Sequence, residues 1–268
     1  DILPFGKLRA SVAQTGKRIP PYANQSVYTS SPSATNSYGV AYDFTNNNPN
    51  LFPERQTTYE VGTELKFLNN RISLDLTYYN TFVDRQVVVN MRASYGTGFI
   101  LNTLNAASIR NQGIESILGV HWIKSNKFNW RTNFNFNRMW NKVTDMPATL
   151  TEFYNSDSWL AGYRASLFLG LPTTTIAGQG YFKNSKGQIL IDPGTGYPLT
   201  NPNYVRIGDR NPDVVLGIQN RLNYRNLNLS FLLDIKIGGD VLNGTEQWMV
   251  QNGLSSRTLD REEVRIIP

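Results

Sequence analysis

Side chains that carry most enzyme and metal chemistry are scarce in this chain. It contains no Cys and a single His, His121. Without Cys there is no disulfide framework and no thiolate metal site. With a single His, neither a His-rich metal centre nor a Ser-His-Asp triad is expected. The glycine-rich stretches lack the spacing of phosphate-binding loops. The sequence therefore predicts a protein that is not an enzyme and uses no cofactor.

Oxygen ligands for a cation are more plentiful. Asp192, Asp209 and Asp213, with Asn201 and Asn211 nearby, could hold Ca²⁺ through their side-chain oxygens. No EF-hand spacing accompanies them, and Asp and Asn are ordinary turn residues. We expect no metal site.

Aromatic side chains in one long polar segment could contact a ligand. Stacking on a ligand, packing on a partner and self-packing of the loop all remain open for them. The candidates within segment 141–213 are Tyr154, Trp159, Tyr163, Tyr181, Tyr197 and Tyr204.

Segment 128–140 has polar and aromatic residues in strict alternation. Successive side chains of a β-strand point to opposite faces. One face would carry Asn129, Arg131, Asn133, Asn135 and Asn137, and the other Trp130, Phe134, Phe136 and Trp140, joined by Trp122 of the preceding segment. A strand with one polar, hydrated face and one apolar face suits the wall of a transmembrane barrel. The amides would then face the lumen, as structural hydrogen-bonding groups rather than a substrate lining, and the aromatics would face lipid or form an interfacial girdle.

Seven segments share this period of two and predict strands. They are 7–13, 59–67, 71–79, 113–122, 128–140, 214–224 and 227–237. Tight connections of two to five residues alternate with long ones, which are 14–58, 80–112, 141–213 and 238–268. An up-and-down barrel places all short turns at one rim and all long loops at the other, as outer-membrane barrels do.

Strand length and composition favour the same fold. At about 3.4 Å per residue, segment 128–140 would span roughly 44 Å, enough to cross a membrane when tilted. Arg138 falls on the aromatic side and is expected at an interface. Charged residues are only 17% of the chain, and the net charge of +6 comes from scattered Lys and Arg. We therefore expect no nucleic-acid partner. No apolar run is long enough for a transmembrane helix.

Several short motifs, in order, resemble the SusC/RagA class of TonB-dependent outer-membrane transporters. The most specific is Asn111-Gln112-Gly113-Ile114-Glu115. The others are Leu8 to Gly16 with its Gln-Thr-Gly turn, Pro53-Glu54-Arg55 with Tyr59 to Gly62, Leu74 to Asn80, Gly170-Leu171-Pro172, Gly178 with Tyr181, Gly187-Gln188-Ile189, and Ile207 to Asp213.

This resemblance implies an all-β, antiparallel up-and-down transmembrane β-barrel of roughly 22 strands with long extracellular loops. Residues 1–268 would be a portion of it with about seven strands, lacking the plug domain and the remaining strands. It further implies the outer membrane of a Gram-negative bacterium, surrounding lipid, energy from TonB and a SusD-like surface lipoprotein. The imported nutrient would be an oligosaccharide or oligopeptide.

A soluble all-β surface module that binds carbohydrate is the alternative. It predicts that the aromatic faces pair into one core. Strand length and the separation of short from long connections argue against it. A β-structured hydrolase lacks a convincing acid–base constellation.

Overall fold

The computed structural model describes residues 2–32, 38–92, 98–148, 150–154 and 162–263. The chain divides into two compact units, and each is considered by itself. The first comprises residues 1–155, 167–173 and 212–238. The second comprises residues 156–166, 174–211 and 239–268.

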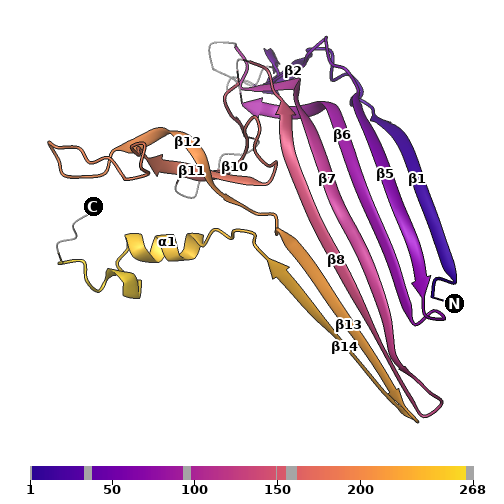
Figure 1. Ribbon diagram of the computed structural model, residues 1–268. Coiled ribbons are helices and arrows are strands. Elements are labelled where there is room, and N and C mark those ends of the chain that lie inside the picture. The colour runs from indigo at the N-terminus through magenta and orange to yellow at the C-terminus, as the bar shows by residue number, and fades with distance from the viewer. Residues whose placement is uncertain (1, 33–37, 93–97, 149, 155–161, 264–268) are drawn as a thin grey trace. The chain divides into compact units, whose positions relative to one another are not determined.

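Seven long strands of the first unit form one antiparallel sheet, which we call the wall (Figure 1). Along the wall they follow the chain order β1, β5, β6, β7, β8, β13, β14. Their bounds are Phe5–Lys17, Glu54–Phe67, Ile72–Arg92, Leu101–Lys124, Phe128–Asp145, Val214–Tyr224 and Leu227–Ile237. The short β4 (Thr45–Asn46) pairs with β7 in parallel. The predicted all-β antiparallel fold is confirmed; within the described residues the sheet stays open, with β1 and β14 at its edges.

Three tight turns join wall strands at the lower end in Figure 1, which we call the turn end. Between β5 and β6, Leu68, Asn69 and Asn70 all have positive φ, at 52°, 53° and 64°. Asn tolerates this conformation better than most residues. In the next turn the Ser125 hydroxyl accepts the Phe128 N–H at 3.0 Å and donates to its carbonyl at 2.9 Å. The three predicted hairpins are therefore confirmed; the opposite end is called the loop end.

The prediction of a long loop over 80–112 is wrong. Strand β6 continues to Arg92 and β7 begins at Leu101, so most of that segment extends the ladder. The pairing passes through register shifts between Val83 and Gln86 and again after Val88. An extra residue at a bulge turns the following side chains to the other face. The period of two is lost there, which hid the strands from a pattern search.

The other long connections also contain regular structure. A hairpin of β2 (Tyr28–Pro32) and β3 (Tyr38–Tyr42) lies within 14–58. The second unit has strands in the order β12 (Thr200–Asp209), β11 (Thr175–Tyr181) and β10 (Tyr163–Leu167), and helix α1 (Gly244–Gln251). Strand β9 (Phe153–Tyr154) and the 3₁₀ turn Ser256–Thr258 complete the elements. No described helix is long and apolar enough to cross a membrane.

Buried apolar side chains gather in one place in the first unit, towards the loop end. Val143 is 0% exposed and Ala106 is 1% exposed, and Val88, Ala107, Met146 and Phe153 pack with them. The middle of the wall is a single layer, and within the described residues of the first unit no second sheet covers either of its faces. Cross-strand contacts within the layer must therefore stabilise the wall.

Candidate functional site

The register of the wall separates polar from apolar side chains. Asn135 lies between Ile117 of β7 and Gly217 of β13, and Phe134 lies between Leu118 and Ile218. The polar face carries Asn129, Arg131, Asn133, Asn135 and Asn137 of β8. The apolar face carries Trp130, Phe134, Phe136 and Trp140, which alternate with them along the same strand.

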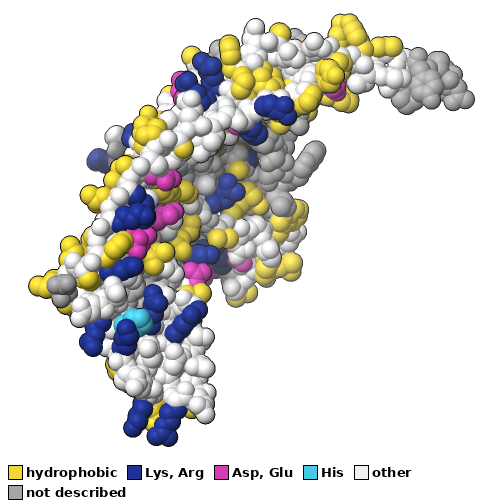
Figure 2. Space-filling view, turned by 90° about the vertical axis from the view of Figure 1, so that its right-hand side faces the viewer, with side chains coloured by type: hydrophobic (Ala, Val, Ile, Leu, Met, Phe, Trp, Pro, Cys, Tyr) yellow, Lys and Arg dark blue, Asp and Glu magenta, His cyan; other side chains and the backbone are white. Residues whose placement is uncertain are grey.

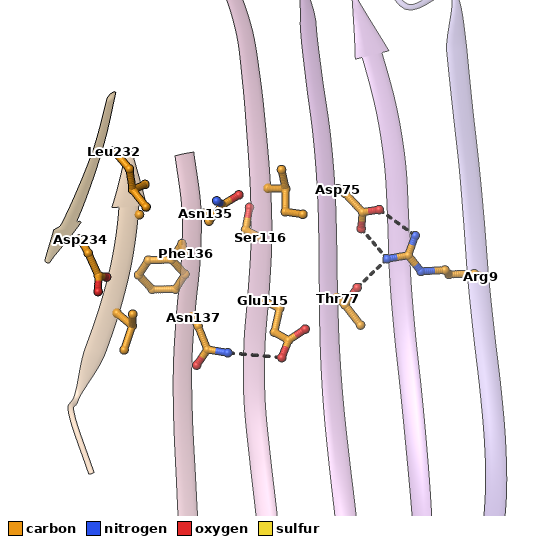
Figure 3. Close-up of a pocket in the computed structure, with 13 residues that line it drawn as sticks. Arg9, Asp75, Thr77, Glu115, Ser116, Asn135, Phe136, Asn137, Leu232 and Asp234 are labelled. Atoms are coloured by element: carbon orange, nitrogen blue, oxygen red, sulfur yellow. Dashed lines mark hydrogen bonds and ion pairs between the residues drawn. The ribbon is translucent and has the colours of Figure 1, made fainter. Parts of the chain in front are cut away.

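A hollow of about 660 Å³ lies on the polar face (Figure 3). Its lining includes Arg9, Asp75, Glu115, Asn137 and Asp234, which belong to β1, β6, β7, β8 and β14. A depression that takes in both edge strands and the strands between them requires the sheet to curve around it. The polar face is therefore the concave face of the wall.

An arginine bridges three strands at one side of the hollow (Figure 3). The Arg9 guanidinium forms a two-point ion pair with Asp75, with one of its bonds at 3.1 Å, and donates to the Thr77 hydroxyl at 2.6 Å. To reach β6 from β1 it passes over β5 at Gly62, where an added Cβ would lie 2.6 Å from Arg9 Nε. Alternation placed these side chains on polar faces, but only the pairing register shows that they meet.

Gly113, from the most specific motif of the sequence, makes room for a tyrosine. The phenol of Tyr79 on the neighbouring strand occupies the space where a Cβ of Gly113 would lie. Two residues later, Glu115 accepts a hydrogen bond from the Asn137 amide at 3.3 Å (Figure 3). The motif thus has a local physical reason. Gly113 leaves room for the Tyr79 ring, and Glu115 forms a hydrogen bond between β7 and β8.

Charge is unevenly distributed along the wall. The turn-end segments 66–73, 119–133 and 219–232 hold two, three and two Lys or Arg residues and no Asp or Glu. Figure 2 shows Lys and Arg towards the lower end, with Asp and Glu only further up. Arg131 and Arg221 are paired directly across β8 and β13. The turn end thus presents a positive face, whereas the hollow mixes both signs.

Two tryptophans on the apolar face cover a polar pair near the turn end. Trp122 and Trp130 have ring centroids 5.9 Å apart. Beneath them the Thr132 hydroxyl donates to the side-chain oxygen of Asn220 at 2.7 Å. The Trp122 N–H donates to the Thr132 hydroxyl at 2.9 Å, and the Trp130 N–H donates to the same Asn220 oxygen at 3.1 Å. Thr132 is 3% exposed and Asn220 is 8% exposed. Indoles with one apolar and one hydrogen-bonding side are typical of membrane interfaces.

Arg138, the charged residue of the apolar face, lies over a ring. Its guanidinium carbon is 4.9 Å from the centroid of Trp140, two residues closer to the loop end. This cation–π contact gives the charge a partner on that face.

The loop aromatics do not converge on one point. In the second unit Tyr163 and Tyr204 lie on opposite faces of the sheet, because Tyr163 pairs with Gly178 and Tyr204 with the next residue, Gln179. The Arg164 guanidinium covers the Tyr204 ring at 3.8 Å. Tyr181 and Tyr197 are exposed, at 50% and 74%. Tyr154 is in β9 of the first unit, and Trp159 lies outside the described residues.

The carboxylates considered for Ca²⁺ have local partners. Asp192 accepts from the Gly194 N–H at 2.9 Å and from the Thr195 hydroxyl at 2.9 Å. These two hydrogen bonds lower the pKa of Asp192, the backbone bond having the larger effect. Asp209 accepts from the Thr174 hydroxyl at 2.5 Å. Among the described residues no group of three or more His, Cys, Asp or Glu side chains is arranged to hold a metal ion.

Known proteins share this architecture. The family model described as "TonB dependent receptor-like, beta-barrel" matches residues 1–214. TonB-dependent receptor P26 of Formosa agariphila is 24% identical over 258 residues, covering 88% of this chain and 26% of the relative. TonB-dependent receptor SusC of Bacteroides thetaiotaomicron is 25% identical over 273 residues, covering 87% of this chain and 25% of SusC.

Among solved structures, that of the RagAB peptide transporter superposes with a TM-score of 0.70 at 21% identity, over 89% of this chain and 27% of that one. The chain spans about a quarter of the length of the curated relatives it matches. The matched family consists of transporters rather than enzymes, in agreement with the sequence prediction. The match over most of the chain, together with the two-faced wall, shows that the chain belongs to the family of TonB-dependent receptor-like β-barrels.

Proposed function

We propose that this wall is part of a transporter that imports a nutrient across the outer membrane of a Gram-negative bacterium. The single observation that carries the proposal is the two-faced wall, one layer thick, with a concave polar face and an apolar opposite face. In a membrane the apolar face contacts lipid and the concave face lines a lumen. Residues 1–268 then supply seven strands of a larger barrel, whose plug and further strands lie elsewhere in the whole protein.

The proposed import draws its energy from TonB and works with a SusD-like surface lipoprotein. The support is likeness: the relatives include SusC, and the superposed structures include a RagAB peptide transporter. We propose an oligosaccharide or an oligopeptide as the substrate class. Of the loop aromatics, the exposed Tyr181 and Tyr197 are the best placed to contact substrate or partner.

The soluble carbohydrate-binding alternative finds less support. It requires the apolar faces of the strands to pair into one core. Instead, Leu229, Leu233 and Ile237 on β14 are 58%, 51% and 56% exposed, and Leu8 on β1 is 84% exposed. A soluble module would have to cover such a surface.

Fractionation and uptake of the full-length protein test the proposal. Cells that produce it should hold it in the outer-membrane fraction and take up labelled oligopeptides or oligosaccharides. Uptake should stop when TonB is depleted, while the amount of protein in the membrane stays unchanged. Recovery in the soluble fraction, or uptake that ignores TonB depletion, contradicts the proposal.

A further inference from the structure

The second unit contains a pocket of about 400 Å³ on the Tyr163 face of its sheet. Ala165 and Ile176, which pair across β10 and β11, form its floor together with Tyr163. Val241 and Leu242 line it from the segment before α1. This volume lies at the lower end of the range for small-molecule sites, about 300–1,000 Å³, and holds one or two residues rather than a long oligomer.

Residues 240–242, which line one side of the pocket, are hydrogen-bonded to β12 through Asp240. The Asp240 N–H donates to the Asp209 carbonyl at 2.6 Å, and the Asp209 N–H donates to the Asp240 carboxylate at 2.7 Å. Asp240 fits there because β12 has a glycine at the contact: a Cβ on Gly208 would lie 2.9 Å from Asp240. Gly244 likewise admits the Tyr163 hydroxyl, which would lie 2.7 Å from an added Cβ.

The charges around this apolar floor are not balanced. Arg164 and Arg210 line the pocket on the basic side, and Asp240 on the acidic side. Arg164 stacks on Tyr204. Arg210 forms no ion pair with the described carboxylates, although its backbone N–H donates to Thr174 at 3.1 Å. Its guanidinium therefore offers a fork of donors suited to a carboxylate.

We propose that this pocket binds the C-terminal residue of a peptide, with an apolar side chain on the Ala165–Ile176 floor and its carboxylate on Arg210. A neutral sugar fits poorly, because it has no apolar side chain for the Ala165–Ile176 floor and no carboxylate for Arg210. A fatty acid shares the apolar group and the carboxylate. The peptide is favoured because its last N–H finds an acceptor in Asp240, which a fatty acid cannot use. The inference rests on the proposed import function and narrows its substrate class to peptides.

Equilibrium binding to the purified full-length receptor tests this inference. The probes are Ala-Ala-Leu with a free carboxylate, the same tripeptide as its C-terminal amide, and octanoate. The acid should bind the wild type about tenfold or more tightly than the amide, since a charge-assisted hydrogen bond is lost in the amide. Arg210→Gln should weaken acid binding to the level of the amide and leave the amide unchanged.

Two further variants separate the pocket from general effects. Val241→Ser removes apolar contact at a position that is 93% exposed, so folding should be preserved. It should weaken the acid and the amide by the same factor. Lys186→Gln removes an exposed cation from the turn between the bridged residues Lys183 and Ile189, outside the pocket, and should change neither.

Three results overturn the inference. One is an acid-to-amide ratio that Arg210→Gln leaves unchanged. Another is octanoate binding as tight as the tripeptide acid, which assigns the pocket to fatty acids. The third is TonB-dependent uptake of oligosaccharides by a receptor that binds none of the three probes, which keeps the proposed function and removes the peptide pocket.

Discussion

Adjacent residues of β8 face different surroundings although they share one strand. Phe134 packs between Leu118 and Ile218 on the apolar face, while Asn135 opens into the hollow of the concave face. In a protein with a covered core, the apolar side would be the inside. In the wall the polar side is the concave one, and no layer of the first unit's described residues covers the middle of the apolar side. The face to which a side chain points, rather than its burial, should therefore decide what a substitution costs.

The largest effect should come from placing a charge on the apolar face. Phe134→Arg, about midway between Trp130 and Trp140, should lower the free energy of unfolding in lipid vesicles by about 2–4 kcal/mol. Urea titration of the full-length receptor measures this. The matched change one residue away, Asn135→Arg, places the same charge in the hollow near acidic groups and should cost little. Equal costs for the two variants would contradict the assignment of the faces.

The second largest effect should come from filling the space that a tyrosine ring occupies on the concave face. Gly113→Ala places a methyl group where the Tyr79 phenol lies and should cost about 1–3 kcal/mol through overpacking. Gly217→Ala is the control, because its added Cβ would find only ordinary contacts at 3.6 Å and beyond. Removing the ring as well, with Tyr79→Ser, should recover most of the loss. The same urea titration applies, and a double variant as unstable as Gly113→Ala would rule out the ring as the cause.

A polar pair hidden on the apolar face should give a somewhat smaller effect. Asn220→Leu leaves the Thr132 hydroxyl and the Trp130 N–H without their acceptor and should cost about 1–2 kcal/mol. Converting Thr132 to Val at the same time removes one of the stranded groups, so the double variant should be the more stable of the two. Indole fluorescence during unfolding reports both. A neutral single variant would mean that water or lipid headgroups replace the lost partner.

The smallest effect should come from the ion pair on the concave face. Arg9 and Asp75 are each 39% exposed, so solvent weakens their attraction. A double-mutant cycle with Arg9→Gln and Asp75→Asn should give a favourable coupling below the other three effects. High salt should reduce it further. A coupling that is large and insensitive to salt would show that the hollow excludes water in the assembled protein.

Much of the wall could be predicted from the alternation of polar and apolar residues alone. The ends of β13 and β14 agree with the predicted segments, because their alternation runs unbroken between the turn at Arg225 and the loop end. The extension of β6 to Arg92 could not be predicted, since bulges break the period where the strands continue. The strands of the second unit could not be predicted, because β11 and β12 are interrupted by Gly and Pro and β10 is only five residues long.

The candidate site was predictable only in part. The alternation of residues along each strand predicts that Arg9, Asp75 and Glu115 lie on polar faces. Their meeting in one hollow depends on the register of non-adjacent strands, which a single sequence does not encode locally. The motif around Gly113 indicates the family. It does not show why a glycine is needed there, which is to leave room for the ring of Tyr79. Tyr163 is one of the candidate ligand contacts that the sequence offers, whereas Arg210, its charged neighbour in the pocket, appears there only as part of the Ile207 to Asp213 motif, with no binding role predicted for it.

The two tryptophans of β8 also set a length. Trp130 lies near the turn end and Trp140 nearer the loop end, both on the apolar face. In the proposed membrane, ten residues at about 3.4 Å, tilted by about 45°, would separate them by roughly 24 Å along the membrane normal, close to the apolar band of outer-membrane barrels, about 25 Å. A bilayer thicker than this would extend acyl chains past the two tryptophans or force the strands to change tilt. Hydrophobic mismatch of the host membrane would therefore act on the shape of the lumen through this one strand.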